Sequence, residues 1–135
     1  FSGLGPELQV TEFDFETSNR DLQAQYTEDF MTAIFSQPKM TGLITWTPFE
    51  YAKNNVPKPE AALIDKDLQF KPNGMVWYEL INKRWMTKTI VSTDDNGYLK
   101  FRGFKGRYLA SISHSKKEIL DIDLSESNEL VITLT

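Results

Sequence analysis

The chain has 135 residues, of which 40% are hydrophobic and 25% are charged, and it contains no cysteine. This composition is typical of a folded globular protein rather than a disordered one, and the length suits one ordinary domain or two very small ones. The net charge is −4 and the 15 basic residues are scattered, which disfavours a nucleic-acid partner. No apolar run approaches the roughly 20 residues that span a membrane.

The first half of the sequence begins with strand, helix and strand patterns in that order. Residues 7–15 mix β-branched and aromatic residues with polar ones, which predicts a strand. A helix start at residues 18–21 is followed by apolar residues at helical spacing, until Pro38 ends the pattern near residue 36. Residues 42–46 form a short apolar run that predicts a buried strand. We therefore expect two parallel strands joined by a helix.

A second helix is predicted after an irregular segment that covers residues 47–72. Its apolar face is marked by Trp77, Leu80, Ile81 and Trp85. The order β-α-β-α is that of consecutive units in a parallel α/β fold. Because the chain begins at Phe1 with neither an initiator Met nor an apolar signal core, we expect that it was cut from a longer protein.

The rest of the sequence predicts an all-β tail. Strand-like runs separated by turn residues occur at 87–93, 98–104, 107–113, 117–124 and 129–134. Asn96-Gly97 predicts a tight turn, because both residues tolerate positive φ. We expect an antiparallel unit with its own apolar core, made of Ile90, Leu99, Tyr108, Ile112, Ile119 and Leu130. The predicted domains are residues 1–86 and 87–135.

Glu12 and Asp14 are the first candidates for chemistry. They lie two residues apart on a predicted strand, at the end where parallel α/β folds place their active sites. The alternative is that these carboxylates are solvated or cap the following helix. Glu50, in the loop after the second predicted strand, is a weaker candidate of the same kind. Trp46 ends the second strand, where its indole could offer a flat face to a sugar ring or be ordinary core.

Two other motifs favour structural roles. His114 lies between Ser113 and Ser115, but nucleophilic catalysis also needs an acid and an oxyanion hole, so a surface turn is preferred. Residues 94–97 resemble the start of a calcium loop, but Lys105 replaces the bidentate carboxylate expected later. A hairpin turn is therefore preferred, and we expect no metal site.

Several segments carry a resemblance to a known family. They are Gln9–Asp14 (QVTEFD), Phe35–Pro38 (FSQP), Thr41–Trp46 (TGLITW), Ala62–Asp67 (ALIDKD) and Lys71-Pro72. In order and spacing they resemble strand seven to the last helix of family 10 glycoside hydrolases, the endo-β-1,4-xylanases. In the tail, Thr93–Gly97 and Gly106–Tyr108 are similar to an accessory segment of plant-like members. That second match is looser.

The resemblance implies both a fold and a function. Residues 1–86 would be the last βαβα portion of a (β/α)8 barrel, and residues 87–135 a small antiparallel β-sandwich-like accessory module. Glu12 would be the nucleophile of a retaining xylanase, forming a covalent glycosyl-enzyme intermediate, and Trp46 would lie under the sugar at the cleavage site. The expected partners are xylan and the remainder of the barrel. The resemblance implies no cofactor, and a secreted or cell-surface location.

Two departures from the family limit what can be carried over. Residues 47–51 replace the Gly and the aromatic-and-basic cluster that many members have after the Trp, so only Trp46 is carried over. The family's acid/base glutamate lies at the end of strand four, which this chain does not contain. We therefore expect the isolated chain to be inactive. The alternatives are a non-catalytic, carbohydrate-binding β-module with exposed Tyr98 and Phe101, or a structural tail that packs on the barrel.

Overall fold

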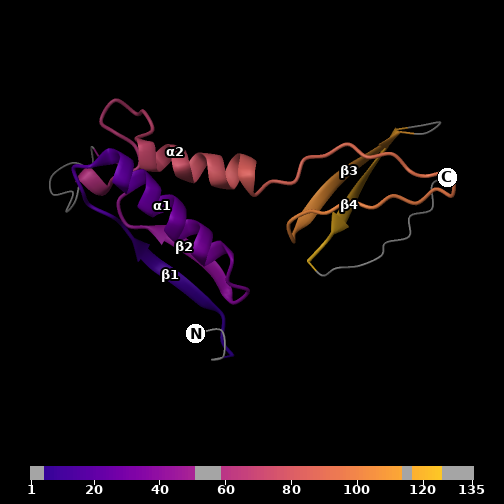
Figure 1. The fold of residues 1–135 in the computed structure, drawn as a ribbon, viewed down its shortest axis with the longest axis horizontal. Coiled ribbons are helices and arrows are strands. Elements are labelled where there is room, and N and C mark those ends of the chain that lie inside the picture. The colour runs from indigo at the N-terminus through magenta and orange to yellow at the C-terminus, as the bar shows by residue number, and fades with distance from the viewer. Residues whose placement is uncertain (1–4, 51–58, 114–116, 126–135) are drawn as a thin grey trace. The chain divides into compact units, whose positions relative to one another are not determined.

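The chain folds as two compact units that divide between Arg84 and Trp85. The computed structural model describes residues 5–50, 59–113 and 117–125 (Figure 1). The first unit contains β1 (Leu8–Phe13), α1 (Arg20–Phe35), β2 (Met40–Thr45), a short 3-10 turn at Pro59–Ala61, α2 (Pro72–Glu79) and a π-helical turn at Leu80–Arg84. The second contains β3 (Arg107–Ser113) and β4 (Lys117–Asp123).

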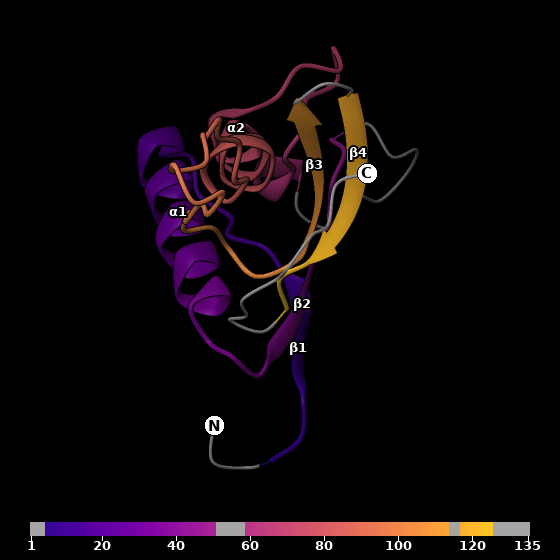
Figure 2. The same ribbon diagram turned by 90° about the vertical axis from the view of Figure 1, so that its right-hand side faces the viewer.

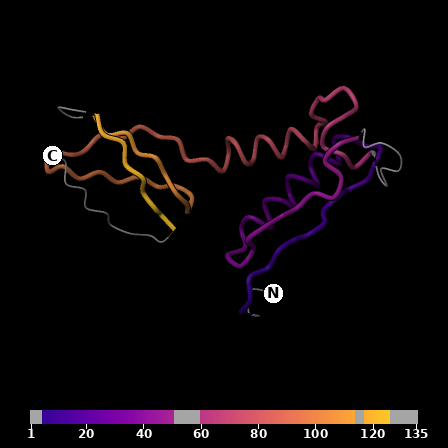
Figure 3. The backbone as a smooth tube through the Cα atoms, turned by 180° about the vertical axis from the view of Figure 1, so that it is seen from behind, coloured from indigo at the N-terminus to yellow at the C-terminus, as the bar shows by residue number. Residues whose placement is uncertain are grey.

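The β1 and β2 strands pair in parallel, and α1 connects them, as the sequence predicted. In Figure 3 the two strands run side by side along one flank of α1. The helix begins where the side chain of Asn19 accepts a hydrogen bond from the backbone N–H of Leu22, at 3.0 Å. It ends at Phe35, shortly before Pro38, because proline cannot continue a helix.

The core of the first unit lies between this sheet and α1. Phe13, which is 7% exposed, stacks on Phe30 with ring centroids 4.5 Å apart, and Phe15 stacks on Tyr26 at 4.2 Å. Met31, at 2% exposed, extends the apolar contact along α1. Burial of the two nearly covered side chains, Phe13 and Met31, contributes about 1.5–3 kcal/mol each. One face of the sheet is therefore fixed against the helix.

The second helix is shorter than its apolar pattern suggested. Regular α-helix ends at Glu79, and the last turn is a π-helix that ends at Arg84. Leu80 is fully buried, whereas Ile81 is 46% exposed. Close packing at the start of α2 depends on Gly74, since a Cβ there would lie 2.1 Å from the backbone oxygen of Leu63. An ion pair between Arg84 and Glu28 links the final turn to α1.

In the second unit, β3 and β4 form the antiparallel hairpin that the sequence predicted, and Figure 2 shows their arrowheads pointing in opposite directions. The predicted turn is also confirmed. The N–H of Gly97 donates to the carbonyl of Asp94 at 3.0 Å, and Gly97 has a φ of +83°. The carboxylate of Asp94 accepts from the N–H groups of Asn96 and Tyr98.

Two further predictions for this unit are wrong. Residues 87–93 and 98–104 form no strand, because the backbone hydrogen bonds between them are confined to the turn at residues 94–98. The predicted core is also largely exposed: Ile90 is 99%, Ile119 67% and Leu99 45% exposed. A single two-stranded hairpin is too small to bury side chains on both faces. Tyr108 and Ile112 are half-buried, whereas Leu130, the run at 129–134 and His114 lie outside the described residues.

Membrane insertion through a helix has no support in the part of the chain that the structure describes. Neither α1 nor α2 combines the length with the apolar character that crossing a bilayer requires.

Candidate active site

Glu12 lies at the carboxyl end of β1, on the face of the sheet that α1 does not cover. Its neighbour Phe13 points into the aromatic core, and successive side chains of a strand point to opposite faces. Glu12 is exposed, and no described residue donates a hydrogen bond to its carboxylate. The side chain is thus presented outward from the strand end.

The pairing of β1 with β2 is irregular at this point. Val10 pairs with Leu43 and Phe13 pairs with Thr45, so β1 has one more residue than β2 between these two pairs. Such a bulge locally redirects side chains, and bulges are common beside active sites. The extra residue falls in the Thr11-Glu12 stretch. The bulge therefore helps to set the direction of the Glu12 side chain.

Trp46 follows the last residue of β2, at the same edge of the sheet. Its backbone N–H donates to the carbonyl of Phe13 at 3.0 Å, and the hydroxyl of Thr45 donates to the same oxygen at 3.3 Å. Trp46 is 50% exposed, so it is not a buried core residue among the residues that the structure describes. The structure thus brings the backbone positions of Glu12 and Trp46 together.

The other two acidic candidates lie elsewhere. Asp14 is half-buried and comes after the end of β1, so strand alternation no longer fixes the direction of its side chain. Glu50 lies beyond β2, where its N–H donates to the carbonyl of Ile64 at 2.9 Å. Glu50 lines a pocket that the sequence did not predict.

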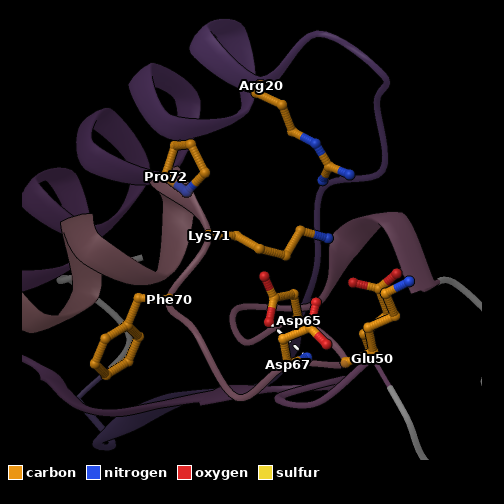
Figure 4. A pocket seen from close by; sticks show the side chains of 8 residues that line it. Arg20, Glu50, Asp65, Asp67, Phe70, Lys71 and Pro72 are labelled. Carbon is orange, nitrogen blue, oxygen red and sulfur yellow. Dashed lines mark hydrogen bonds between the residues drawn. The ribbon is translucent and has the colours of Figure 1, made fainter.

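This pocket has a volume of about 380 Å³ and lies where α1 and α2 begin (Figure 4). It is lined by Arg20, Glu50, Asp65, Lys66, Asp67, Phe70, Lys71 and Pro72. In Figure 4 the cationic groups of Arg20 and Lys71 extend into the same space as the carboxylates of Asp65 and Glu50. The sequence signals for this pocket were weak: Glu50 is a minor candidate, and Asp65 and Asp67 lie in a segment whose pattern indicates only a loop before Lys71-Pro72.

The carbonyl of Glu60 holds the basic wall of the pocket in place. It accepts hydrogen bonds from Arg20 at 3.1 Å, from Gln23 at 2.8 Å and from Lys71 at 2.9 Å. Lys71 is only 6% exposed. Desolvation lowers the pKa of its ammonium, and the charge of Arg20 lowers it further, while Glu50, Glu60 and Asp65 oppose the shift.

The acidic wall is shaped by a turn around Asp65. One oxygen of the Asp65 carboxylate accepts hydrogen bonds from the N–H groups of Asp67 and Gln69, both at 2.9 Å. This turn holds Leu68 at a φ of +61°. Among the described residues, no three His, Asp or Glu side chains are arranged to hold a metal ion. The pocket is therefore a polar site of mixed charge.

Comparison with known proteins relates the chain, at low identity and over a small part of each relative, to endo-xylanases, which are glycoside hydrolases. Endo-1,4-beta-xylanase 2 of Arabidopsis thaliana is 24% identical over 87% of this chain, and Endo-1,4-beta-xylanase 1 of the same plant is 24% identical over 95%. Anti-sigma-I factor RsgI6 of Acetivibrio thermocellus is 27% identical over 83% of this chain. No family model matches the sequence.

The matched stretch is a small part of each relative. The chain spans 14% of the length of the anti-sigma factor, 11% of Endo-1,4-beta-xylanase 2 and 14% of Endo-1,4-beta-xylanase 1. The relatives also differ in their described roles. The similarity therefore supports a distant relationship to xylanases. It does not identify a catalytic residue in this chain.

Proposed function

We propose that the chain is the C-terminal part of a retaining endo-β-1,4-xylanase and that Glu12 is its catalytic nucleophile. The observation that carries this proposal is the hydrogen bond from the N–H of Trp46 to the carbonyl of Phe13, at the carboxyl edge of a parallel strand pair. It holds Glu12 and Trp46 where parallel α/β enzymes gather their catalytic groups.

The incomplete sheet supports the same proposal. Parallel sheets are normally covered on both faces and extended at their edges, because every strand needs partners and burial. Among the described residues of this unit, α1 covers one face of a sheet of two strands, while Ile44 is 55% exposed and Trp46 50%. We infer that further barrel strands complete this sheet in a longer protein, and that the hairpin unit is an accessory module.

The proposal implies the two-step mechanism of a retaining glycosidase. Glu12 would attack the anomeric carbon of a xylan residue while an acid outside this chain protonates the departing oxygen. A covalent ester would form on Glu12, and the same outside group would then activate water to release the sugar. The indole of Trp46 would support the ring during attack. Both carboxyl groups are needed, at a separation of about 5–5.5 Å.

Covalent trapping tests the role of Glu12. A longer protein that contains this chain would be incubated with a 2-deoxy-2-fluoro-xylobioside carrying a good leaving group. The expected product is an adduct on the peptide that contains Glu12, because the fluorine slows both formation and hydrolysis of the ester, while the good leaving group restores the rate of formation. An adduct on another carboxylate, in an enzyme that still hydrolyses xylan, would overturn the assignment. If the proposal holds, we expect the longer protein to be secreted or displayed at the cell surface, since xylan is outside cells.

A second candidate function is carbohydrate binding by the hairpin unit. Tyr98 is 63% exposed and Phe101 is 39% exposed, so both rings could contact a sugar. Depletion of the protein by insoluble xylan, reduced in a Tyr98→Ala, Phe101→Ala variant, would support this role. Equal depletion of the variant would count against it. Phe101 also packs edge-on against Tyr108 at 6.0 Å, so thermal stability must be compared in parallel.

A further inference from the structure

We propose that the pocket between the starts of α1 and α2, whose lining includes neither Glu12 nor Trp46, binds one neutral sugar unit. The proposal deepens the function proposed above and rests on it, because the natural ligand would be part of the same polysaccharide. The volume of about 380 Å³ falls within the range of small-molecule sites, roughly 300–1,000 Å³.

The charge of the lining argues for a neutral ligand. Arg20, Lys66 and Lys71 carry three positive charges, and Glu50, Asp65 and Asp67 carry three negative charges. A free anion would meet the carboxylates, and a free cation would meet Arg20 and Lys71. A sugar hydroxyl, in contrast, donates one hydrogen bond and accepts others, so it can use both kinds of side chain at once.

The hydrogen-bonding capacity of these side chains is only partly used within the described residues. The carboxylates of Glu50 and Asp67 accept no hydrogen bond there, and one oxygen of Asp65 accepts two. Arg20 donates to its two partners through Nη1 alone. Acceptor atoms of Glu50 and Asp67 and further donors of Arg20 are therefore available to a ligand within the described residues.

An apolar surface completes the site. Phe70 lines the pocket and is 49% exposed, and its ring packs against Tyr78 at 5.8 Å. Sugar rings present patches of C–H groups that pack on aromatic side chains while their hydroxyls form hydrogen bonds. The lining is mainly polar, unlike that of sites for apolar ligands, and this difference again favours a polyhydroxylated ligand.

The test is a titration of the 135-residue chain, labelled with ¹⁵N, followed by NMR. The probes are xylotriose, cellotriose, inorganic phosphate and calcium chloride. We expect a trisaccharide to shift the backbone amides of residues 65–71. Asp67→Asn and Glu50→Gln should each weaken binding about tenfold, because each replaces a charge-assisted hydrogen bond. The matched control is Asp29→Asn, an exposed carboxylate on α1 outside the pocket lining.

Each outcome bears on the proposal. Loss of binding in Asp67→Asn, with unchanged binding in Asp29→Asn, supports it. Cellotriose binding at residues 65–71 without xylotriose binding would support the pocket and contradict the xylanase proposal. Xylotriose shifts confined to the region of Glu12 and Trp46 would overturn the pocket and leave the xylanase proposal intact. Amide shifts caused only by phosphate or calcium would also overturn the proposed sugar site. So would the absence of shifts with all four probes.

Discussion

The N–H of Trp46 donates a hydrogen bond to the carbonyl of Phe13 at 3.0 Å, one residue beyond the end of β2. Because a backbone hydrogen bond does not depend on the side chains involved, Glu12 and Trp46 can be changed without breaking this link. The two proposed site residues can therefore be tested by substitutions that leave the strand pairing in place.

Glu12→Gln in a longer, xylan-hydrolysing protein should lower turnover by several orders of magnitude. The amide has the same shape but cannot form the glycosyl ester. Folding should be unchanged, because no described residue donates a hydrogen bond to the Glu12 side chain. Reducing-sugar release and circular dichroism measure the two effects. The matched control is Glu16→Gln, which changes an exposed carboxylate just past β1. If turnover by Glu12→Gln stays within a small factor of wild type, the assignment of Glu12 is wrong.

The isolated 135-residue chain should not hydrolyse xylan, even at high protein concentration. Glu50 is the acidic candidate nearest in sequence to Trp46, but it lines the separate pocket with Arg20 and Lys71. Catalytic groups must be positioned to within roughly half an ångström. The assay is product release from xylan by the purified chain. Hydrolysis that disappears in Glu12→Gln would show instead that the chain contains its own acid.

Trp46→Ala in the longer protein should raise KM for xylan about tenfold, because the indole is half-exposed and its ring would be lost from the sugar site. Trp46→Phe keeps an aromatic face and should recover most of the loss. The measurement is initial rate against xylohexaose concentration. Identical KM values for the Ala and Phe variants would show that Trp46 does not contact the sugar.

Gly74→Ala should destabilise the first unit by about 2–4 kcal/mol, because a Cβ would lie 2.1 Å from the carbonyl oxygen of Leu63 and backbone would have to move. Gly42→Ala is the control, since its Cβ would make ordinary contacts of 3.5 Å with the flexible Gln9 side chain. Urea midpoints followed by tryptophan fluorescence report both. Equal midpoints would mean that α2 does not depend on this close approach.

The contribution of Lys71 to stability should rise with pH across the alkaline range just below the ordinary pKa of lysine. Burial lowers the pKa of Lys71 in the folded chain, so between the folded and unfolded pKa values the unfolded state binds more protons. Deprotonation then favours folding. Lys71→Met should reduce this slope, and urea midpoints measured over that range test it. A slope that is unchanged in Lys71→Met would assign the effect to other lysines.

The first unit could be predicted from sequence because its local signals agree with its packing. Asn19 caps α1 within the predicted helix start, and residues 8–13 form the predicted strand, although β1 ends before Asp14 and so does not hold Glu12 and Asp14 on one regular strand face. The pocket could not be predicted, because Arg20, Glu50 and Lys71 are far apart in the chain and meet only through the carbonyl of Glu60 and the turn at Asp65. A backbone oxygen leaves no sequence signal.

The second unit was harder to predict, because strand propensity does not show which segments will pair. Residues 107–113 and 117–124 have a short connection and pair as predicted. The runs at 87–93 and 98–104 have similar composition and a good turn between them, yet they form no ladder. Ile90 and Ile119 remain exposed for the same reason, since apolar residues are buried only when a second surface is available.

The turn at Asp94 also affects the rate of deamidation at Asn96. An Asn-Gly pair loses ammonia when the glycine nitrogen attacks the asparagine side chain, and the product is a mixture of aspartate and isoaspartate. In the folded turn the nitrogen of Gly97 is held by the carbonyl of Asp94 at 3.0 Å, which restrains that attack on Asn96. Deamidation at Asn96 should therefore accelerate whenever the turn opens. The slow gain of negative charge during storage would then act as a chemical record of how often this turn opens.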